Sequence, residues 1–268
     1  MVHTTGHGHG HGHGHGDDVF ARLQANGQPI IVVLDDDHSR RAQDFTDLQN
    51  NAKPLNASIA QSMDKRQAIN RLLIDRCIKN SQIPLLRGGD RIEFLTDSPG
   101  KLSAKIMGFK TLRYATGILL IGTGFRSTRA WEEAVAVDVA KDEDAAFQTI
   151  SDFWEGYGRF PAVHQAITGD KGMVVLREST WLASANVMYA VAAAAHEISK
   201  GGKATVGQAM KALGSIDFNR SGSTLDNTLV EPAQDGKPAK ARTGRDAWEG
   251  AAATLIALVT EELGLTSS

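Results

Sequence analysis

Polar side chains interrupt the apolar faces of several predicted helices, and such positions can bind an anion. Arg41, Arg66 and Lys105 are the charged ones. An unpaired buried charge costs several kcal/mol, so each needs a partner. The partner is an acidic side chain, for example an aspartate beside Arg66, or solvent reached by a lysine stem, or a phosphate on which the three cations converge. A misplaced helix boundary is a further explanation for a charge on an apolar face. With their neighbours, the candidate anion or nucleotide pocket comprises Arg41, Phe45, Gln49, Arg66, Asn70 and Lys105.

Residues suited to covalent or metal chemistry are scattered along the chain. Cys77 lies on an apolar helical face, which is more typical of core packing than of a nucleophile. His38, His164 and His196 lack the spacing of a metal site, and the sequence contains no P-loop. The aspartates at 35–37 suit either magnesium or, more commonly, a solvated helix start. We assign no catalytic residue and no metal ligand, and expect no enzymatic activity of the chain by itself.

Exposed lysines and arginines are the residues expected to contact a nucleic-acid backbone. The chain has 29 Lys and Arg against 31 Asp and Glu, a net charge of −2 and a pI of about 6.5. DNA binding would therefore need a local basic patch, and its contacts would be mostly to phosphate and sensitive to salt. An ordinary charged surface is the alternative. The candidate DNA-backbone contacts are Arg40, Lys53, Lys65, Lys101, Arg126, Arg129, Arg220 and Arg242.

The composition is that of a globular protein. Of 268 residues, 41% are hydrophobic and 22% charged, which is enough to bury a core. The single cysteine excludes a disulfide within the chain and fits a reducing compartment, so we expect a cytoplasmic protein. The longest apolar run, near 181–195, is shorter than the about 20 residues of a membrane span and predicts a buried helix.

Histidine and glycine alternate from His7 to Gly16. Glycine removes backbone stiffness and the imidazoles bind nickel or zinc, so residues 1–16 are predicted to be a disordered purification tag. A native metal-binding tail is the alternative.

Apolar periodicity and turn residues predict a mostly helical chain with a small α/β portion. Two short strands are predicted at 30–34 and 91–95, and the segment 173–176 is either a strand that pairs with them or the start of a helix. A polar, glycine-rich loop is predicted at 219–244. Helices are predicted at about 39–50, 59–79, 101–120, 179–199, 206–213 and 245–263, with two more within 128–157.

Three stretches, taken in order, resemble the DndB family, also described as DGQHR-domain proteins. Residues 30–66 are similar to that family's strand, a helix with a Phe-Asp-Leu-Asn pattern, the letters NNAKP, and a serine-led helix with an Asp-x-Arg pair. Residues 91–120 form the second stretch. The third is ALGSIDFNRSG at 212–222, followed by the closing helix. The resemblance covers roughly residues 19–265 and rests on the order and spacing of these motifs.

Two features depart from the family pattern. The Asp-Gly-Gln-His-Arg signature, which lies upstream of the strand in the family, does not occur, since proline follows Gly27 and Gln28. Gln49 stands where the family has asparagine, and Asn50 comes one place late, which is a different face of a helix. Those two motifs are associated with nucleotide hydrolysis in relatives. With one absent and the other altered, we assign no cofactor, ATP included.

The resemblance implies a DNA-binding regulator or accessory protein of a bacterial DNA phosphorothioate (sulfur) modification system. It also implies a partial DGQHR-type α/β region at 17–125, similar to the ParB and sulfiredoxin fold, and a helical C-terminal domain at 126–268. The implied partners are DNA and other DNA-modification proteins. No membrane association is expected, and homo-oligomerisation is left open. The alternatives are a nucleotide-hydrolysing partner of a DNA base-modification enzyme, which the absent motif disfavours, and a protein–protein scaffold that does not bind DNA, which the acidic pI favours.

Overall fold

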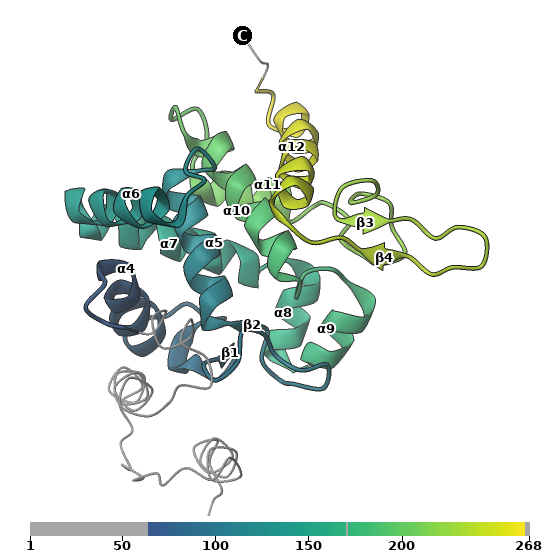
Figure 1. Cartoon of the computed structure of the whole chain (residues 1–268), viewed down its shortest axis with the longest axis horizontal. Coiled ribbons are helices and arrows are strands. Elements are labelled where there is room, and N and C mark those ends of the chain that lie inside the picture. Colours follow the sequence, from purple (N-terminus) through teal and green to yellow (C-terminus); the bar gives the residue numbers. More distant parts are fainter. Residues whose placement is uncertain (1–63, 170, 266–268) are drawn as a thin grey trace, which may run out of the picture. The chain divides into compact units, whose positions relative to one another are not determined.

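The computed structural model describes residues 64–169 and 171–265, which are mostly helical with small sheets, as the sequence predicts (Figure 1). The predicted tag, strand 30–34 and helix 39–50 lie outside the described residues. The first elements are α4 (Ala68–Arg71), a π-helix (Leu72–Lys79), a helical turn (Arg87–Gly89), β1 (Ile92–Glu93), β2 (Met107–Gly108), α5 (Phe109–Ile121), α6 (Thr128–Lys141) and α7 (Glu143–Gly158). They are followed by α8 (Pro161–Thr168), α9 (Met173–Ser179), α10 (Ala185–Ser199), α11 (Val206–Leu213), β3 (Val230–Glu231), β4 (Lys240–Ala241) and α12 (Arg245–Glu262).

The helix α10 packs between α5 and α12 (Figure 1). Its residues from Ala190 to Ala195 are alanines and one valine, all buried, and such small side chains let the neighbouring helices approach closely. The apolar run at 181–195 therefore includes a buried helix, as predicted. Within residues 64–169 and 171–265, no helix combines the length and the apolar character needed to cross a membrane.

The helices α5 and α6 meet at a glycine. A Cβ atom at Gly117 would lie 2.0 Å from Cζ2 of Trp131, so the indole can pack on α5 only because position 117 has no side chain. The buried hydrophobic residues form one cluster that runs from Ile69 to Val259. This core is continuous across the boundary predicted at residue 125, and the division into two domains there stays a prediction.

The two small sheets have different topologies. β1 and β2 are parallel, with Ile92 opposite Met107, whereas β3 and β4 form an antiparallel hairpin with Val230 opposite Ala241. The predicted strand at 91–95 is thus confirmed at its centre, but its partner is β2. The segment 173–176 is not its partner, because this segment begins the helix α9.

The helix predicted at 101–120 begins only at Phe109, and the prediction for its first eight residues is wrong. The guanidinium of Arg177 on α9 binds the carbonyls of residues 101, 103 and 105, at 2.7, 3.2 and 2.7 Å. The amide of Ile106 donates to the carbonyl of Arg91 at 2.8 Å. These long-range bonds hold the segment in a non-helical path to β2, and this outcome is not visible in local periodicity.

Other helix boundaries also shift where side chains or distant backbone take up hydrogen bonds. Residues 64–67 form a turn, because the Asp64 side chain accepts from the amide of Arg66 at 3.0 Å, so the helix predicted at 59–79 starts at Ala68 within the described part. The helix predicted from residue 179 starts at Ala185, because the amide of Trp181 donates to the carbonyl of Phe218 at 3.0 Å. The predicted loop at 219–244 contains the β3–β4 hairpin, and α8 was not predicted.

The predicted pair of helices within 128–157 is confirmed as α6 and α7. Each begins with a side-chain cap: Ser127 accepts from the amide of Ala130 at 3.1 Å, and Asp142 accepts from that of Ala145 at 3.0 Å. The helices predicted at 206–213 and 245–263 are also present, the second ending at Glu262.

Candidate functional site

A buried arginine, Arg113 of α5, is the centre of a polar cluster that joins α4, α5 and α6. Only 9% of its side chain is exposed. Its Nη1 and Nη2 atoms donate to Oε1 and Oε2 of Glu132, at 2.8 and 2.6 Å. Its Nε atom donates to Oδ1 of Asn70 at 2.6 Å, and Nη2 also donates to the side-chain oxygen of Gln67. The planar guanidinium suits this two-pronged carboxylate contact better than an ammonium would.

The charge of Arg113 is thus balanced within the protein. The guanidinium carbon also lies 5.3 Å from the ring centroid of Trp131, so an aromatic face covers the remaining side of the cation. We refer to Arg113, Glu132, Asn70 and Gln67 as the Arg113 cluster. An anion could bind Arg113 only by displacing Glu132, so the geometry favours a clamp between helices over an anion site.

The predicted anion pocket is only partly within the described residues, since Arg41, Phe45 and Gln49 lie outside them. Asn70 is fully buried in the Arg113 cluster, and its Nδ2 donates to the carbonyl of Asp64 at 2.8 Å. Arg66 lies before α4 and 78% of its side chain is exposed, so its predicted place on the apolar face of a helix is wrong; it pairs with the Asp64 carboxylate at 2.5 Å, as the salt-bridge alternative expects. Hydrogen bonds from Arg66 hold the pKa of Asp64 below its usual range, against the effect of burial.

Lys105, the last member of the predicted pocket, takes part in a different contact. Its Nζ lies 3.4 Å from Oε2 of Glu93, a residue of β1 that is itself buried. The structure therefore brings Arg66 and Asn70 together at Asp64 and gives Lys105 a carboxylate of its own. The pocket as a whole stays a prediction.

The predicted DNA-backbone residues differ in how they are held. Arg40 and Lys53 lie outside the described part, and Lys101 is exposed in the loop before β2. Lys65 pairs with Asp75 at 3.0 Å. Arg126, Arg129 and Arg242 are exposed and make ion pairs with Glu249 at 3.5 Å, Glu133 at 3.1 Å and Glu231 at 3.1 Å, respectively. Exposed pairs of this kind are weak, so these arginines remain available to another anion.

Arg220 has a structural role that the sequence did not reveal. Its Nε atom donates to the carbonyls of Arg177 and Thr180, at 2.9 and 3.2 Å. Its guanidinium carbon lies 4.0 Å from the ring centroid of Trp181. Burial lowers the pKa of Arg220. These contacts connect the loop after α11 to the end of α9, and the carbonyls and the indole that contact the Arg220 guanidinium are neutral.

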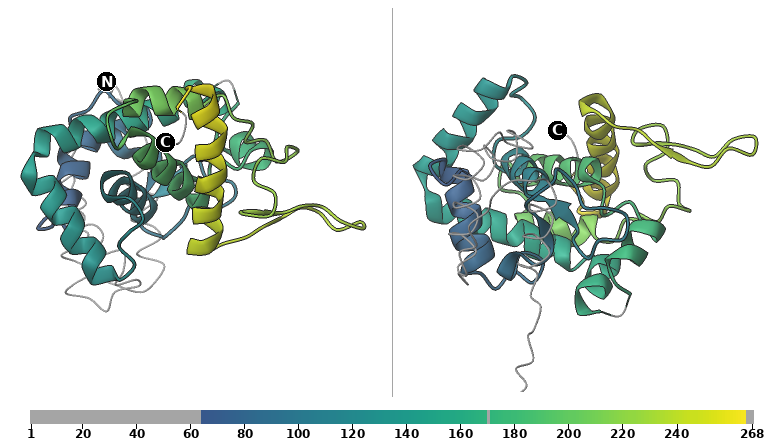
Figure 2. Two further views of the ribbon diagram at one scale, coloured as in Figure 1. Left: turned by 90° about the horizontal axis from the view of Figure 1, so that it is seen from above. Right: turned by 60° about the horizontal axis from the view of Figure 1, so that its bottom comes forward.

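The β3–β4 hairpin extends away from the helices just before α12, in both views of Figure 2. Asp235 and Gly236 form its tip with φ of 44° and 78°, and the backbones of Gln234 and Lys237 are bonded to each other in both directions, at 3.2 and 2.7 Å. Two successive positive φ values are typical of the tight turn that matches strand twist. Lys237 and Lys240 are exposed on this preformed hairpin, and neither was singled out from the sequence.

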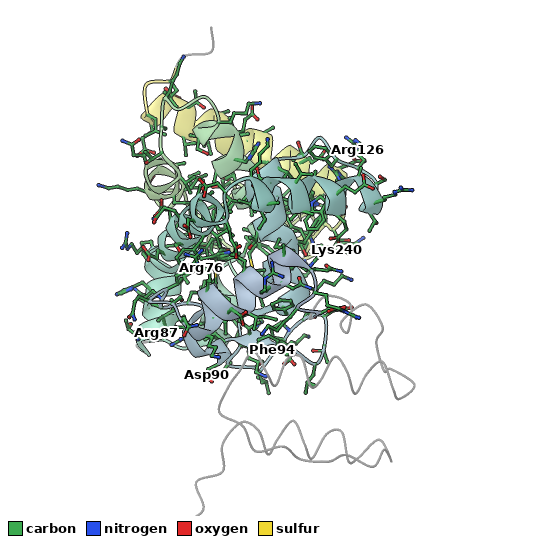
Figure 3. The ribbon with its side chains drawn as sticks, turned by 90° about the vertical axis from the view of Figure 1, so that its left-hand side faces the viewer. Arg76, Arg87, Asp90, Phe94, Arg126 and Lys240 are labelled. Carbon is green, nitrogen blue, oxygen red and sulfur yellow. The ribbon has the colours of Figure 1, made fainter. Side chains whose placement is uncertain are left out.

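The base of the hairpin lies close to the loop before α6. Arg245, the first residue of α12, donates to the carbonyls of Thr123 and Phe125, at 2.5 and 3.2 Å. The same arginine pairs with Glu249 at 2.6 Å, and Glu249 also contacts Arg126. Arg126 and Lys240 lie toward one side of Figure 3. We refer to Arg126, Lys237, Lys240 and Arg242 as the hairpin patch.

Most of the chain matches the model of one known protein family. Residues 18–259 match the family described as DndB, DNA-sulfur modification-associated. The chain belongs to the DndB family. The match confirms the resemblance seen in the sequence motifs and implies involvement in a DNA sulfur modification system.

Both the Arg113 cluster and the hairpin patch lie inside the segment matched to the DndB family. No curated protein and no solved structure matches the chain. Among the residues that the structure describes, no group of three histidine, cysteine or acidic side chains is placed to hold a metal ion.

Proposed function

We propose that this DndB-family protein is a DNA-binding regulator or accessory protein of a phosphorothioate modification system. The observation that carries the proposal is the family match over residues 18–259, because it connects the chain to DNA sulfur modification. The proposed partners are DNA and the other proteins of that system. The proposed binding mode is contact with the DNA phosphates.

The hairpin patch is the surface that best supports such contacts. Between residues 230 and 242, the three basic residues Lys237, Lys240 and Arg242 outnumber the two acidic residues, Glu231 and Asp235, whereas the whole chain carries a net charge of −2. A local excess of positive charge on a projecting hairpin can reach the phosphates without bringing the acidic body against them. Arg126, which pairs with Glu249 on α12, is the fourth exposed cation of this set. Phosphate contacts set position and affinity, so the patch supports binding without assigning a recognised sequence.

The test is the binding of the full chain to a labelled DNA duplex across a salt series. A chelator keeps the histidines at 7–15 from holding metal ions. Each phosphate contact lowers the slope of log affinity against log salt by about 0.9, so a patch of four cations predicts a slope of roughly −3 to −4. Failure to bind duplex DNA at low salt would overturn the proposal. It would favour the scaffold alternative, which a pull-down with the modification enzymes then tests.

A further inference from the structure

One face of α6 remains uncovered within the described part of the chain. Trp131, Val135 and Val139 face the core, but Val137 is 59% exposed. Phe125, in the loop before α6, is 37% exposed. Both side chains line the same groove, where they form a small exposed apolar surface.

This face borders a groove with a volume of about 540 Å³. Leu120 and Ile121, at the end of α5, form one wall, and Phe125 closes one end. The other wall is α6 itself, which presents Ala130, Ala134, Val137 and Lys141 at intervals of three and four residues. That spacing forms a single stripe on a helix, and its alanines would let another helix approach closely.

Two charges beside Val137, Glu133 and Lys141, lie at equal distances from it along α6, whereas Asp138, which also lines the groove, has the uncharged Ala136 at its mirror position. Glu133 lies four residues before Val137, and Lys141 lies four residues after it. If a second α6 lay antiparallel on the first, with a two-fold axis at Val137, Glu133 of each chain would face Lys141 of the other. A two-fold interface needs such self-complementarity, in which residue i meets j and j meets i.

Other alignments of the two helices lose this match. An axis midway between residues 135 and 136 would place Glu133 opposite Asp138, so that two like charges would meet. The intrachain partner of Glu133 is Arg129, at 3.1 Å, and both side chains are more than half exposed. That weak pair leaves Glu133 able to accept a second cation.

We propose that the groove beside α6 is the interface between two copies of this chain, with their α6 helices antiparallel and crossing at Val137. The pairing buries Val137 of both copies and forms two Glu133–Lys141 ion pairs. This inference uses no residue of the hairpin patch, although Phe125 of the groove directly precedes Arg126 in the chain.

The first test measures the mass of the full chain in solution, by light scattering after size exclusion and by sedimentation equilibrium. Both use micromolar protein with a chelator present. The wild-type chain should be a dimer. Val137→Asp should raise the dimer dissociation constant about tenfold or more, because it places a charge at the centre of the interface. Since Val137 is exposed in the single chain, the thermal melting curve of the variant should resemble that of the wild type.

The second test exchanges the charges. Glu133→Lys and Lys141→Glu should each weaken the homodimer, and the double variant should recover it. Mixing the two single variants should yield heterodimers, because every facing pair is then opposite in charge. Lys211→Glu, at an exposed lysine on α11, is the matched control and should have no effect.

Three results would overturn the proposal. The first is a monomeric wild-type chain at these concentrations. The second is a dimer that Val137→Asp leaves intact, which would place self-association on another surface. The third is a double charge variant that associates no better than the single ones, which would exclude this register.

Discussion

The Arg113 cluster and the hairpin patch use the same kind of side chain under opposite conditions. Arg113 is buried, and a carboxylate and two side-chain amides occupy its donors. Lys237 and Lys240 are exposed on a two-stranded hairpin whose tight turn holds it open to solvent. A buried cation must receive its counter-charge from the chain, whereas an exposed one can take it from a ligand. The difference separates cations that hold the fold from exposed cations that can pair with an external anion, such as the DNA phosphates of the proposed function.

The largest expected effect is the loss of stability on replacing the buried cation, Arg113. Arg113→Met should lower the free energy of unfolding by about 3 kcal/mol, because Glu132 loses its partner in a partly buried place. Urea denaturation measures this change. Arg129→Met removes an exposed arginine from the next helix and is the matched control, with an expected loss of at most about 0.5 kcal/mol. Equal losses for the two variants would contradict the contrast between buried and exposed cations.

A smaller loss is expected at Arg220, which lies between the two extremes. Arg220→Lys keeps the charge but loses the planar stacking on Trp181 and the fixed bonds to two carbonyls. The free energy of unfolding should fall by about 1–2 kcal/mol, while DNA affinity at a given salt concentration should stay unchanged. If Arg220→Lys weakened DNA binding without altering stability, Arg220 would belong with the exposed cations instead.

The buried thiol of Cys77 allows a further test of the core, because its burial makes the stability of the protein depend on pH. Burial raises the pKa of its thiol to about 12, from 9.0 in the ordinary state, and the nearby Arg76 opposes this only in part. Below pH 9 the thiol is neutral in the folded and the unfolded chain. Between pH 9 and 12 only the unfolded chain releases the proton, so stability falls as the pH rises through this window.

At about pH 10 this group alone should cost about 1.4 kcal/mol of stability. Comparing urea denaturation at about pH 8 and about pH 10 for the wild type and Cys77→Ala isolates the contribution, since Ala has no thiol to ionise. Burial also raises the pKa of Tyr157, and its effect is common to both proteins. If the two proteins lost the same stability over this range, the thiol would not be buried as described.

The sequence predicted the helical elements where local rules govern them. Ser127 and Asp142 cap their helices, and the alanine-rich run of α10 had the composition of a buried helix. Local periodicity gave no sign of Arg177, whose donors keep residues 101–105 out of a helix from 72 or more residues away. Helix boundaries that depend on such distant contacts can be predicted only when the tertiary structure is known.

The rule that a polar residue on an apolar helical face is buried and needs a partner holds for some residues of the predicted pocket and not for others. It holds for Asn70, which is buried, whereas Arg66 lies before α4 and is exposed, although it does pair with an aspartate. Arg113 also lies inside the predicted helix at 101–120, four residues after Phe109 and therefore on the same face, so the same rule could have singled it out. The sequence analysis named Lys105 instead, which lies before the start of α5. The hairpin lysines were missed because residues 219–244 were predicted as a loop, although Asp235-Gly236 is a strong signal for a tight turn.

The most direct test of the central contrast is the salt dependence of DNA binding by Lys237→Ala/Lys240→Ala, compared with Lys203→Ala/Lys211→Ala. Both double variants remove two exposed lysines and leave the net charge equal, but only the first pair lies on the hairpin. Between about 50 and about 200 mM salt, the slope of log affinity against log salt should be roughly 1.8 less negative for the hairpin variant than for the wild type. The slope of the control variant should equal that of the wild type. Unchanged stability of both variants would show that the fold is intact. Equal slopes for the two variants would contradict the account, since the hairpin would then contact DNA no more than the rest of the surface does.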